Sequence, residues 1–160
     1  MKTKKLLFIL NPRAGRNKPH GPLFDALAIL SGAGYLIRIH ETSAPGDAAD
    51  TAAREGAGYD LVVAAGGDGT LNEVVNGAAG FDNAAVTCVP KGTGNDFLKL
   101  FGPRFRELFY DLEALAAGPQ RAFDLMDCNG KLGLDVVWST VGARIAAGVY
   151  KPKDLRFVSG

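Results

Sequence analysis

The chain has 160 residues, of which 47% are hydrophobic, and its formal net charge is +1 at pH 7. This length suits one substantial hydrophobic core. The nearly balanced charge excludes binding to nucleic acid, or to an anionic bilayer, through overall charge alone.

No run of 18 apolar residues occurs, so the sequence predicts no membrane-spanning helix. The first apolar run, Leu6 to Leu10, meets Asn11-Pro12-Arg13 at once and is too short for an export signal. Cys88 and Cys128 have neither metal-site nor disulfide-framework spacing. We therefore expect a cytoplasmic protein whose contact with lipid is peripheral.

Strands and helices alternate along the first part of the chain. Short apolar runs bounded by Gly, Pro or Asn predict strands at residues 5–10, 35–40, 59–65 and 84–89. Helix patterns lie between them at residues 22–30, at 47–54 and from residue 70 onward. This order predicts an α/β domain with a mostly parallel sheet, in which ligands bind beyond the carboxyl ends of the strands.

The pattern changes twice beyond the fourth strand. Apolar residues at helical spacing between Phe105 and Leu115 predict one amphipathic helix, which Gly118-Pro119 ends. From Arg121 the segments are short and alternating, and Asn129-Gly130 predicts a β-hairpin. We therefore divide the chain into an α/β domain at residues 1–120 and the beginning of a β-rich second domain at residues 121–160.

The string GGDGTLNEVVNG, which starts at Gly66, directly follows a predicted strand and precedes a helix. Its glycines should permit unusual backbone dihedrals and let N–H groups approach an anion, while the helix start adds a positive dipole end. A phosphate group fits this loop. Within it, Asp68 would repel phosphate unless a metal bridges them or it handles a proton, so Mg²⁺ binding and general-base roles both remain open.

Simpler structural roles stand beside this interpretation. Thr70 and Glu73 have the T-x-x-E spacing of a capping box, so Glu73 is interpreted as structural and Thr70 as a cap, a phosphate ligand or both. The chain contains neither G-x-x-x-x-G-K-[ST] nor G-x-G-x-x-G, which excludes a P-loop and a typical dinucleotide fold.

Two further loops are predicted at the same edge of the sheet. The segment PKGTGNDF, from Pro90, offers Thr93 and Asn95 as helix caps, and Asp96 either complements the helix dipole or pairs with Asp68 around a metal or hydroxyl. The first loop, NPRAGRNK, is basic and either clamps phosphates or is simply solvated. Thr42 follows the second strand and lies at this edge too.

The strings NPRAG, GGDGTLNEVVNG and PKGTGNDF, in this order and each after a strand, resemble the catalytic domain of the diacylglycerol kinase family and of its sphingosine and ceramide kinase relatives. GGDGT is also shared with NAD kinases and is similar to the phosphofructokinase loop, whereas PKGTGNDF indicates lipid kinases. The resemblance implies a three-layer α/β sandwich like that of NAD kinases and diacylglycerol kinases.

The same resemblance implies the reaction and its residues. ATP would pass its γ-phosphoryl group to the hydroxyl of a lipid such as diacylglycerol, mainly by alignment and charge neutralisation. The catalytic residues would be Asp68 and Asp96, and Mg²⁺ would be held near Asp68, Asp96 and Asp124. The implied ATP contacts are Asn11, Thr42, Gly66, Gly67, Asp68, Gly69, Thr70, Leu71, Asn72 and Thr93.

Family members are nearly twice as long as this chain, and their second domain carries a structural Mg²⁺ site and a catalytic carboxylate. We therefore expect these 160 residues to be a truncated part of a longer enzyme and to be inactive alone. An NAD kinase-like enzyme and a non-catalytic nucleotide-binding module are the alternatives. The expected partners are ATP and a membrane lipid, without nucleic acid, and the sequence leaves the oligomeric state open, a homodimer included.

Overall fold

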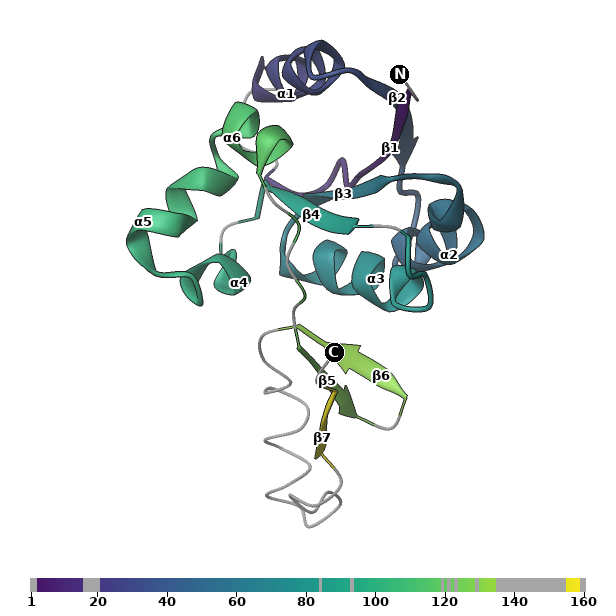
Figure 1. Ribbon diagram of the computed structural model, residues 1–160. Coiled ribbons are helices and arrows are strands. Elements are labelled where there is room, and N and C mark those ends of the chain that lie inside the picture. Colours follow the sequence, from purple (N-terminus) through teal and green to yellow (C-terminus); the bar gives the residue numbers. More distant parts are fainter. Residues whose placement is uncertain are drawn as a thin grey trace. The chain divides into compact units, whose positions relative to one another are not determined.

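A computed structural model gives the structure of the chain (Figure 1). Two compact units form, Met1–Gln120 and Arg121–Gly160, and each is described by itself. The structure describes residues 3–15, 21–83, 85–92, 94–118, 120, 122, 124–128, 130–134 and 155–158.

A four-stranded parallel sheet forms the centre of the first unit, in the order β2-β1-β3-β4. The strands are β1 (Lys4–Leu10), β2 (Tyr35–Glu41), β3 (Leu61–Gly66) and β4 (Ala85–Pro90). Buried side chains fill both faces of the two central strands, as parallel sheets require. The predicted α/β class with a mostly parallel sheet is confirmed.

Helices cover both faces of this sheet. Helix α1 (Gly21–Gly32) packs on one face, and α2 (Asp47–Glu55) and α3 (Asp68–Ala78) pack together on the other (Figure 1). A 3₁₀ turn, η1 (Gly56–Gly58), follows α2. The result is a three-layer arrangement in which every strand of the sheet delivers its carboxyl end to the same edge.

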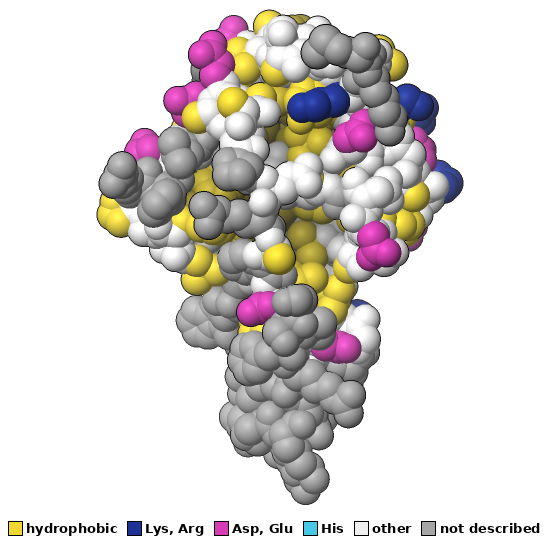
Figure 2. Space-filling model, viewed as in Figure 1, with side chains coloured by type: hydrophobic (Ala, Val, Ile, Leu, Met, Phe, Trp, Pro, Cys, Tyr) yellow, Lys and Arg dark blue, Asp and Glu magenta, His cyan; other side chains and the backbone are white. Residues whose placement is uncertain are grey.

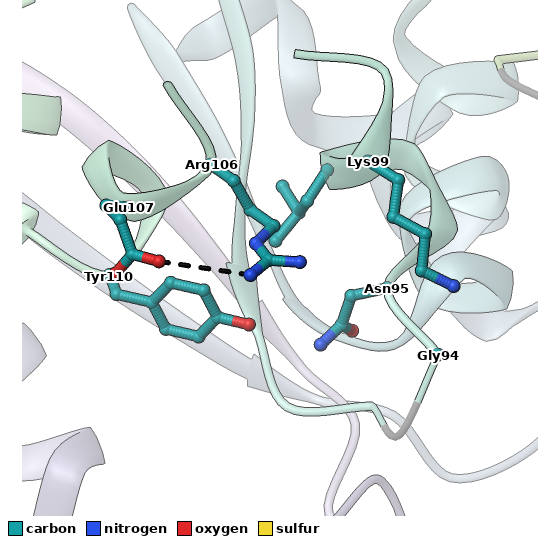
Figure 3. A pocket seen from close by; sticks show the side chains of 7 residues that line it. Gly94, Asn95, Lys99, Arg106, Glu107 and Tyr110 are labelled. Atoms are coloured by element: carbon teal, nitrogen blue, oxygen red, sulfur yellow. Dashed lines mark ion pairs between the residues drawn. The ribbon is translucent and has the colours of Figure 1, made fainter. Parts of the chain in front are cut away.

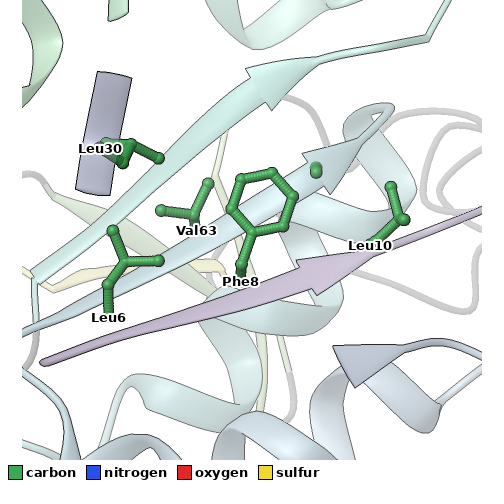
Figure 4. Close-up of a cluster of buried hydrophobic side chains, with 6 residues drawn as sticks. Leu6, Phe8, Leu10, Leu30 and Val63 are labelled. Atoms are coloured by element: carbon green, nitrogen blue, oxygen red, sulfur yellow. The ribbon is translucent and has the colours of Figure 1, made fainter. Parts of the chain in front are cut away.

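The hydrophobic core beneath α1 contains alternate residues of the central strands. In Figure 4 the side chain of Leu30, from α1, lies above Phe8 and Val63. Successive side chains of a strand point to opposite faces, so the neighbours of Phe8 along β1 serve the other core, under α2 and α3. The cluster consists of Leu6, Phe8, Leu10, Leu30, Val63 and Ala65.

The prediction of a single amphipathic helix between residues 105 and 115 is wrong. The chain forms α4 (Asp96–Lys99), α5 (Gly102–Arg106), the 3₁₀ turn η2 (Glu107–Phe109) and α6 (Leu112–Ala117). The break falls at Asp111, whose carboxylate accepts a hydrogen bond of 3.0 Å from the Ala114 N–H and so starts a new helix.

The second unit contains an antiparallel sheet in the order β6-β5-β7. Its strands are β5 (Leu125–Cys128), β6 (Lys131–Gly133) and β7 (Leu155–Val158). The predicted hairpin is confirmed, since β5 and β6 pair across a tight turn in which Gly130 has a φ of 77°. The Gly130 N–H donates to the Asp127 carboxylate over 2.7 Å and closes this turn.

Among the described residues, none of the helices has the length and apolar character needed to cross a membrane. On the face shown in Figure 2, the described basic side chains lie mainly at the upper right, whereas acidic side chains lie on both sides.

The turn between β2 and α2 is organised by one carboxylate, that of Asp47. It accepts hydrogen bonds from the Ser43 N–H (2.7 Å), the Ser43 hydroxyl (2.9 Å) and the Thr51 hydroxyl (3.2 Å), and it contacts His40 Nε2 at 3.0 Å. The bonds from Ser43, followed by that from His40, hold the pKa of the Asp47 carboxyl well below its usual range. His40, at the end of its strand, belongs to this structural network.

The contact between α2 and α3 yields a stability prediction. A methyl group at Gly77 would lie 2.8 Å from the Ala52 Cβ and 2.9 Å from the Ala53 nitrogen. We expect Gly77→Ala to lower the free energy of unfolding by about 1–3 kcal/mol, because overpacking outweighs the higher helix propensity of alanine. Urea denaturation measures this change. Gly58→Ala, where a methyl group meets nothing within 4 Å, is the control and should show no such loss.

The Asp47 network predicts a pH dependence. Because the folded-state pKa of Asp47 is lowered, its contribution to stability is present above the unfolded-state pKa of about 3.9 and is lost as the pH falls through the folded-state pKa. Asp47→Asn should therefore destabilise the protein at pH 7, and its difference from wild type should shrink towards pH 3. Urea denaturation at several pH values tests this, and a difference that is constant with pH contradicts it.

Candidate functional site

The loops that follow β1, β3 and β4 meet at the carboxyl edge of the sheet. The carbonyl of Gly66 accepts hydrogen bonds from the N–H groups of Lys91 (2.8 Å) and Gly92 (3.3 Å), which joins the second and third loops. The first loop contacts the third at Gly15, where a side chain would overlap the Lys91 carbonyl oxygen. Backbone contacts therefore hold all three loops together.

Close approach, rather than unusual dihedrals, explains most of these glycines. We expected special dihedrals at Gly66, Gly67 and Gly69, but none of them has a positive φ. A Cβ atom at Gly66 would lie 2.6 Å from that of Thr70, and one at Gly92 would lie 2.7 Å from the Gly67 Cα. The expectation of unusual dihedrals is therefore wrong for Gly66, Gly67 and Gly69, while Gly66 and Gly92 are constrained by a neighbouring side chain or backbone.

Gly69 differs from its neighbours, because a Cβ atom built on it meets nothing within 4 Å. It occupies the second position of α3, where alanine would be the better helix former. Neither its dihedrals nor its packing requires glycine. The space beside Gly69 is open at the edge of the sheet.

Helix α3 begins at Asp68, two residues earlier than predicted. The prediction of a capping box formed by Thr70 and Glu73 is wrong. No side chain caps this helix, and the residue at its N-cap is Gly67. The Glu73 carboxylate instead accepts the Gly46 N–H (3.0 Å), which ties α3 to the turn before α2. The Thr70 hydroxyl, 6% exposed, accepts a hydrogen bond of 3.0 Å from the Asn11 amide.

The start of α3 has the features of an anion site. Its first N–H groups, those of Asp68, Gly69 and Thr70, precede the first intrahelical hydrogen bond, which the Leu71 N–H donates to the Gly67 carbonyl. These groups form the positive end of the helix dipole. Because Gly69 adds no side chain there, a phosphate oxygen can approach the N–H groups directly.

Asn11 and Thr42 lie side by side at this edge. Asn11 donates its backbone N–H to the Ala65 carbonyl (2.9 Å), and its side-chain oxygen accepts the Arg13 N–H (2.9 Å), which shapes the first loop. The Thr42 N–H donates to the carbonyl of Leu10, the residue before Asn11, over 2.9 Å. Asn11 therefore lies beside Thr70, near the start of α3, and Thr42 lies next to Asn11 on the neighbouring strand end.

The other residues predicted from the sequence for this site have different surroundings from those of Asn11 and Thr42. The side chain of Leu71 is buried in the core, whereas Asn72 is exposed and its carbonyl accepts a hydrogen bond of 2.8 Å from the Asn76 amide. Thr93 lies outside the described residues. The predicted cap at Asn95 occupies the N-cap position of α4, but its amide donates back to the Gly92 carbonyl over 3.0 Å.

Asp68 and Asp96 lie on either side of Gly94. A side chain at Gly94 would begin 3.3 Å from the Asp68 Oδ2 and 3.9 Å from the Asp96 carboxylate. Asp68 also accepts the Phe97 N–H over 3.3 Å, and Asp96 forms an ion pair with Lys99. The third predicted carboxylate, Asp124, belongs to the second unit and is exposed. The pairing of Asp68 with Asp96 predicted from the sequence thus has a geometric basis.

These carboxylates fit a magnesium ion that is shared with a ligand. Among the described residues, no group of three or more His, Cys, Asp or Glu side chains could hold a metal. Mg²⁺ is commonly bound by one or two carboxylates together with substrate phosphates and water. The carboxylates of Asp68 and Asp96, which both lie near Gly94, offer two such ligands.

Gly94 and Cys88 also contribute to the site, although neither was predicted to do so from the sequence. Gly94 keeps the space between Asp68 and Asp96 clear, and the G-x-G spacing of residues 92 and 94 was the signal for it. Burial, with a smaller contribution from the Asp68 charge, raises the pKa of the Cys88 thiol to about 12. This thiol therefore stays protonated at neutral pH and acts as a small apolar residue beneath the site.

Comparison with known proteins agrees with the sequence motifs. The family model described as the diacylglycerol kinase catalytic domain matches residues 5–128. The diacylglycerol kinase of Bacillus subtilis (strain 168) is 35% identical over 161 residues, covering 98% of this chain and 52% of that protein. That of Staphylococcus aureus (strain MRSA252) is 45% identical over 98 residues, covering 59% of this chain and 30% of that protein.

Solved structures show the same fold. The crystal structure of a diacylglycerol kinase from Bacillus anthracis str. Sterne superposes with a TM-score of 0.70 and 29% identity, over 82% of this chain and 46% of that one. The chain thus spans about half the length of these relatives or less. The predicted resemblance is confirmed, and the chain belongs to the family of the diacylglycerol kinase catalytic domain.

Proposed function

We propose that the complete gene product is an ATP-dependent lipid kinase, which transfers the γ-phosphoryl group of ATP to the hydroxyl of a lipid such as diacylglycerol. Membership of the diacylglycerol kinase catalytic domain family supports a lipid kinase. The arrangement of the loops at the sheet edge supports a nucleotide as the phosphoryl donor.

The observation that carries this proposal is the open position at Gly69. Gly66 and Gly92 are required by packing, whereas a side chain built at Gly69 has no neighbour within 4 Å. A glycine that the fold does not need, at the positive end of a helix, is explained by a ligand whose phosphates must approach the backbone. Asn11 and Thr42, on the adjacent strand ends, are then the side chains for the rest of the nucleotide.

The two carboxylates of the first unit, those of Asp68 and Asp96, would hold Mg²⁺. Bound there, the ion would neutralise charge on the ATP phosphates. Asp68 lies closest to the opening at the start of α3, so it would position the metal or accept the proton of the lipid hydroxyl. Asp96, in the first turn of α4, would place its carboxylate on the other side of Gly94.

The acceptor lipid determines where the reaction takes place. Diacylglycerol resides in the bilayer, so the enzyme would act as a peripheral protein at the cytoplasmic face of the membrane. Affinity for that surface would come from local contacts, because the net charge of the chain is only +1.

The nucleotide part of the proposal predicts a separation of binding from stability. Gly69→Ala should leave the free energy of unfolding unchanged or raise it by up to about 1 kcal/mol. The same methyl group should weaken ATP binding about tenfold or more, because it occupies the path of a phosphate to the N–H groups. Calorimetry with ATP and Mg²⁺, beside urea denaturation, measures both quantities on the 160-residue chain.

The control for this variant is Gly80→Ala, which lies beyond the other end of α3 and is equally open. It should leave ATP affinity unchanged. Full ATP affinity in Gly69→Ala would remove the support that this position gives to a nucleotide site.

The catalytic role proposed for Asp68 predicts that Asp68→Asn abolishes phosphoryl transfer in the complete gene product. The amide retains an acceptor for the Phe97 N–H, so the fold should persist while the charge needed for Mg²⁺ or for proton transfer is lost. Transfer of label from γ-labelled ATP is measured with diacylglycerol and with NAD as parallel acceptors.

Asp60→Asn is the matched control, because the Asp60 carboxylate also accepts a backbone N–H, that of Lys5 over 2.8 Å, at the opposite edge of the sheet. It should keep wild-type transfer. Labelling of NAD instead of the lipid would assign an NAD kinase, and ATP binding without any transfer by the wild-type protein would assign a non-catalytic nucleotide module.

A further inference from the structure

A polar cavity lies beside the site, between α4 and the segment from α5 to Tyr110. Its volume is about 360 Å³. Gly94 and Asn95 form one wall, and Arg106, Glu107 and Tyr110 form the other. Because Gly94 also separates the two candidate catalytic carboxylates, the cavity borders the proposed transfer centre.

Three hydrogen-bonding groups converge on this cavity. Figure 3 shows the Arg106 guanidinium, the Tyr110 hydroxyl and the Asn95 amide directed towards the same space. The guanidinium carries five N–H donors in a fixed planar fork, which suits an oxyanion with two or more oxygens. The phenol of Tyr110 supplies one further donor.

Of the two basic residues that line the cavity, Arg106 has no hydrogen-bonded carboxylate among the described residues. Within the part of the chain that the structure describes, its ion-pair partner is Glu107, at 4.0 Å, which is too far for a hydrogen bond. The Glu107 side chain is 72% exposed and can turn into water without losing a close partner. Lys99, the other basic residue of the lining, is paired with Asp96.

We propose that this cavity binds a phosphate group other than those of the nucleotide. Phosphate is tetrahedral and multiply charged, and it accepts bidentate hydrogen bonds from arginine. The exposed apolar side chains of Leu100 and Tyr110 lie on the same segments and suit a phosphate carried by a lipid. This source, a phospholipid at the membrane or the phosphorylated product, rests on the proposed lipid kinase function; free phosphate is the alternative source of the same chemistry.

Arg106→Gln tests the cavity on the 160-residue chain. Calorimetric titrations use glycerol 3-phosphate and inorganic phosphate, with a saturating non-hydrolysable ATP analogue present so that the nucleotide site is filled. We expect Arg106→Gln to weaken binding of these probes about tenfold or more, through loss of a charge-assisted contact. The affinity of the ATP analogue, titrated separately, should stay unchanged.

The matched control is Arg54→Gln. Arg54 is also exposed and also pairs with the glutamate that follows it, at 3.2 Å, but it lies on α2. It should leave all affinities unchanged. If Arg106→Gln does not fold, Tyr110→Phe, which removes only the hydroxyl, should still weaken phosphate binding several-fold.

Vesicles distinguish the two sources of phosphate. Sedimentation with phosphatidylcholine vesicles, with and without phosphatidic acid, should show binding that requires both phosphatidic acid and Arg106 if the phosphate is carried by a lipid. Arg106-dependent binding of the soluble probes without vesicle binding assigns free phosphate and also supports the cavity.

Equal binding of every probe to wild type and to both cavity variants overturns the cavity, as does the absence of any binding to wild type. Failure of the proposed nucleotide function is recognised separately. In that case the ATP analogue does not bind, while the dependence of glycerol 3-phosphate binding on Arg106 persists.

Discussion

The close approach of three backbone loops is the constraint on which the rest of the site depends. The absence of a side chain at Gly66 leaves space for the side chain of Thr70. Gly67 lies against Gly92, and Gly15 lies against the Lys91 carbonyl. A methyl group at Gly66, Gly92 or Gly15 would overlap a neighbouring atom, so the loops have essentially one relative arrangement. That arrangement directs the start of α3 and both candidate carboxylates towards one opening.

The local sequence was sufficient to predict the four parallel strands and the edge of the sheet at which the site lies. Apolar runs of strand length, ended by Gly, Pro or Asn, determine the four parallel strands, and the rule that ligands bind beyond their carboxyl ends then places Asn11, Thr42 and Gly69 at one edge. Order along the chain was enough for this step, because no side-chain geometry is involved.

The features of the site that were not predicted from the sequence depend on contacts between residues that are distant in the sequence. Thr70 and Glu73 have capping-box spacing, but each finds a better partner on another element, Asn11 and Gly46, so the local pattern is overridden. Glycine is likewise required at position 92 because of a residue of another loop, Gly67. The division of residues 102–117 into short helices depends on Asp111, a capping residue that the apolar periodicity conceals.

The place of β1 in the sheet has a consequence for biosynthesis. This strand is made before the other strands of its sheet, yet it lies between β2 and β3 and is covered on both faces only after α1, α2 and α3 have formed. Its buried run, Leu6 to Leu10, therefore stays without its native cover until about half of the 160 residues have been synthesised. Such an apolar strand is the segment of the nascent chain that a ribosome-associated chaperone would shield from aggregation.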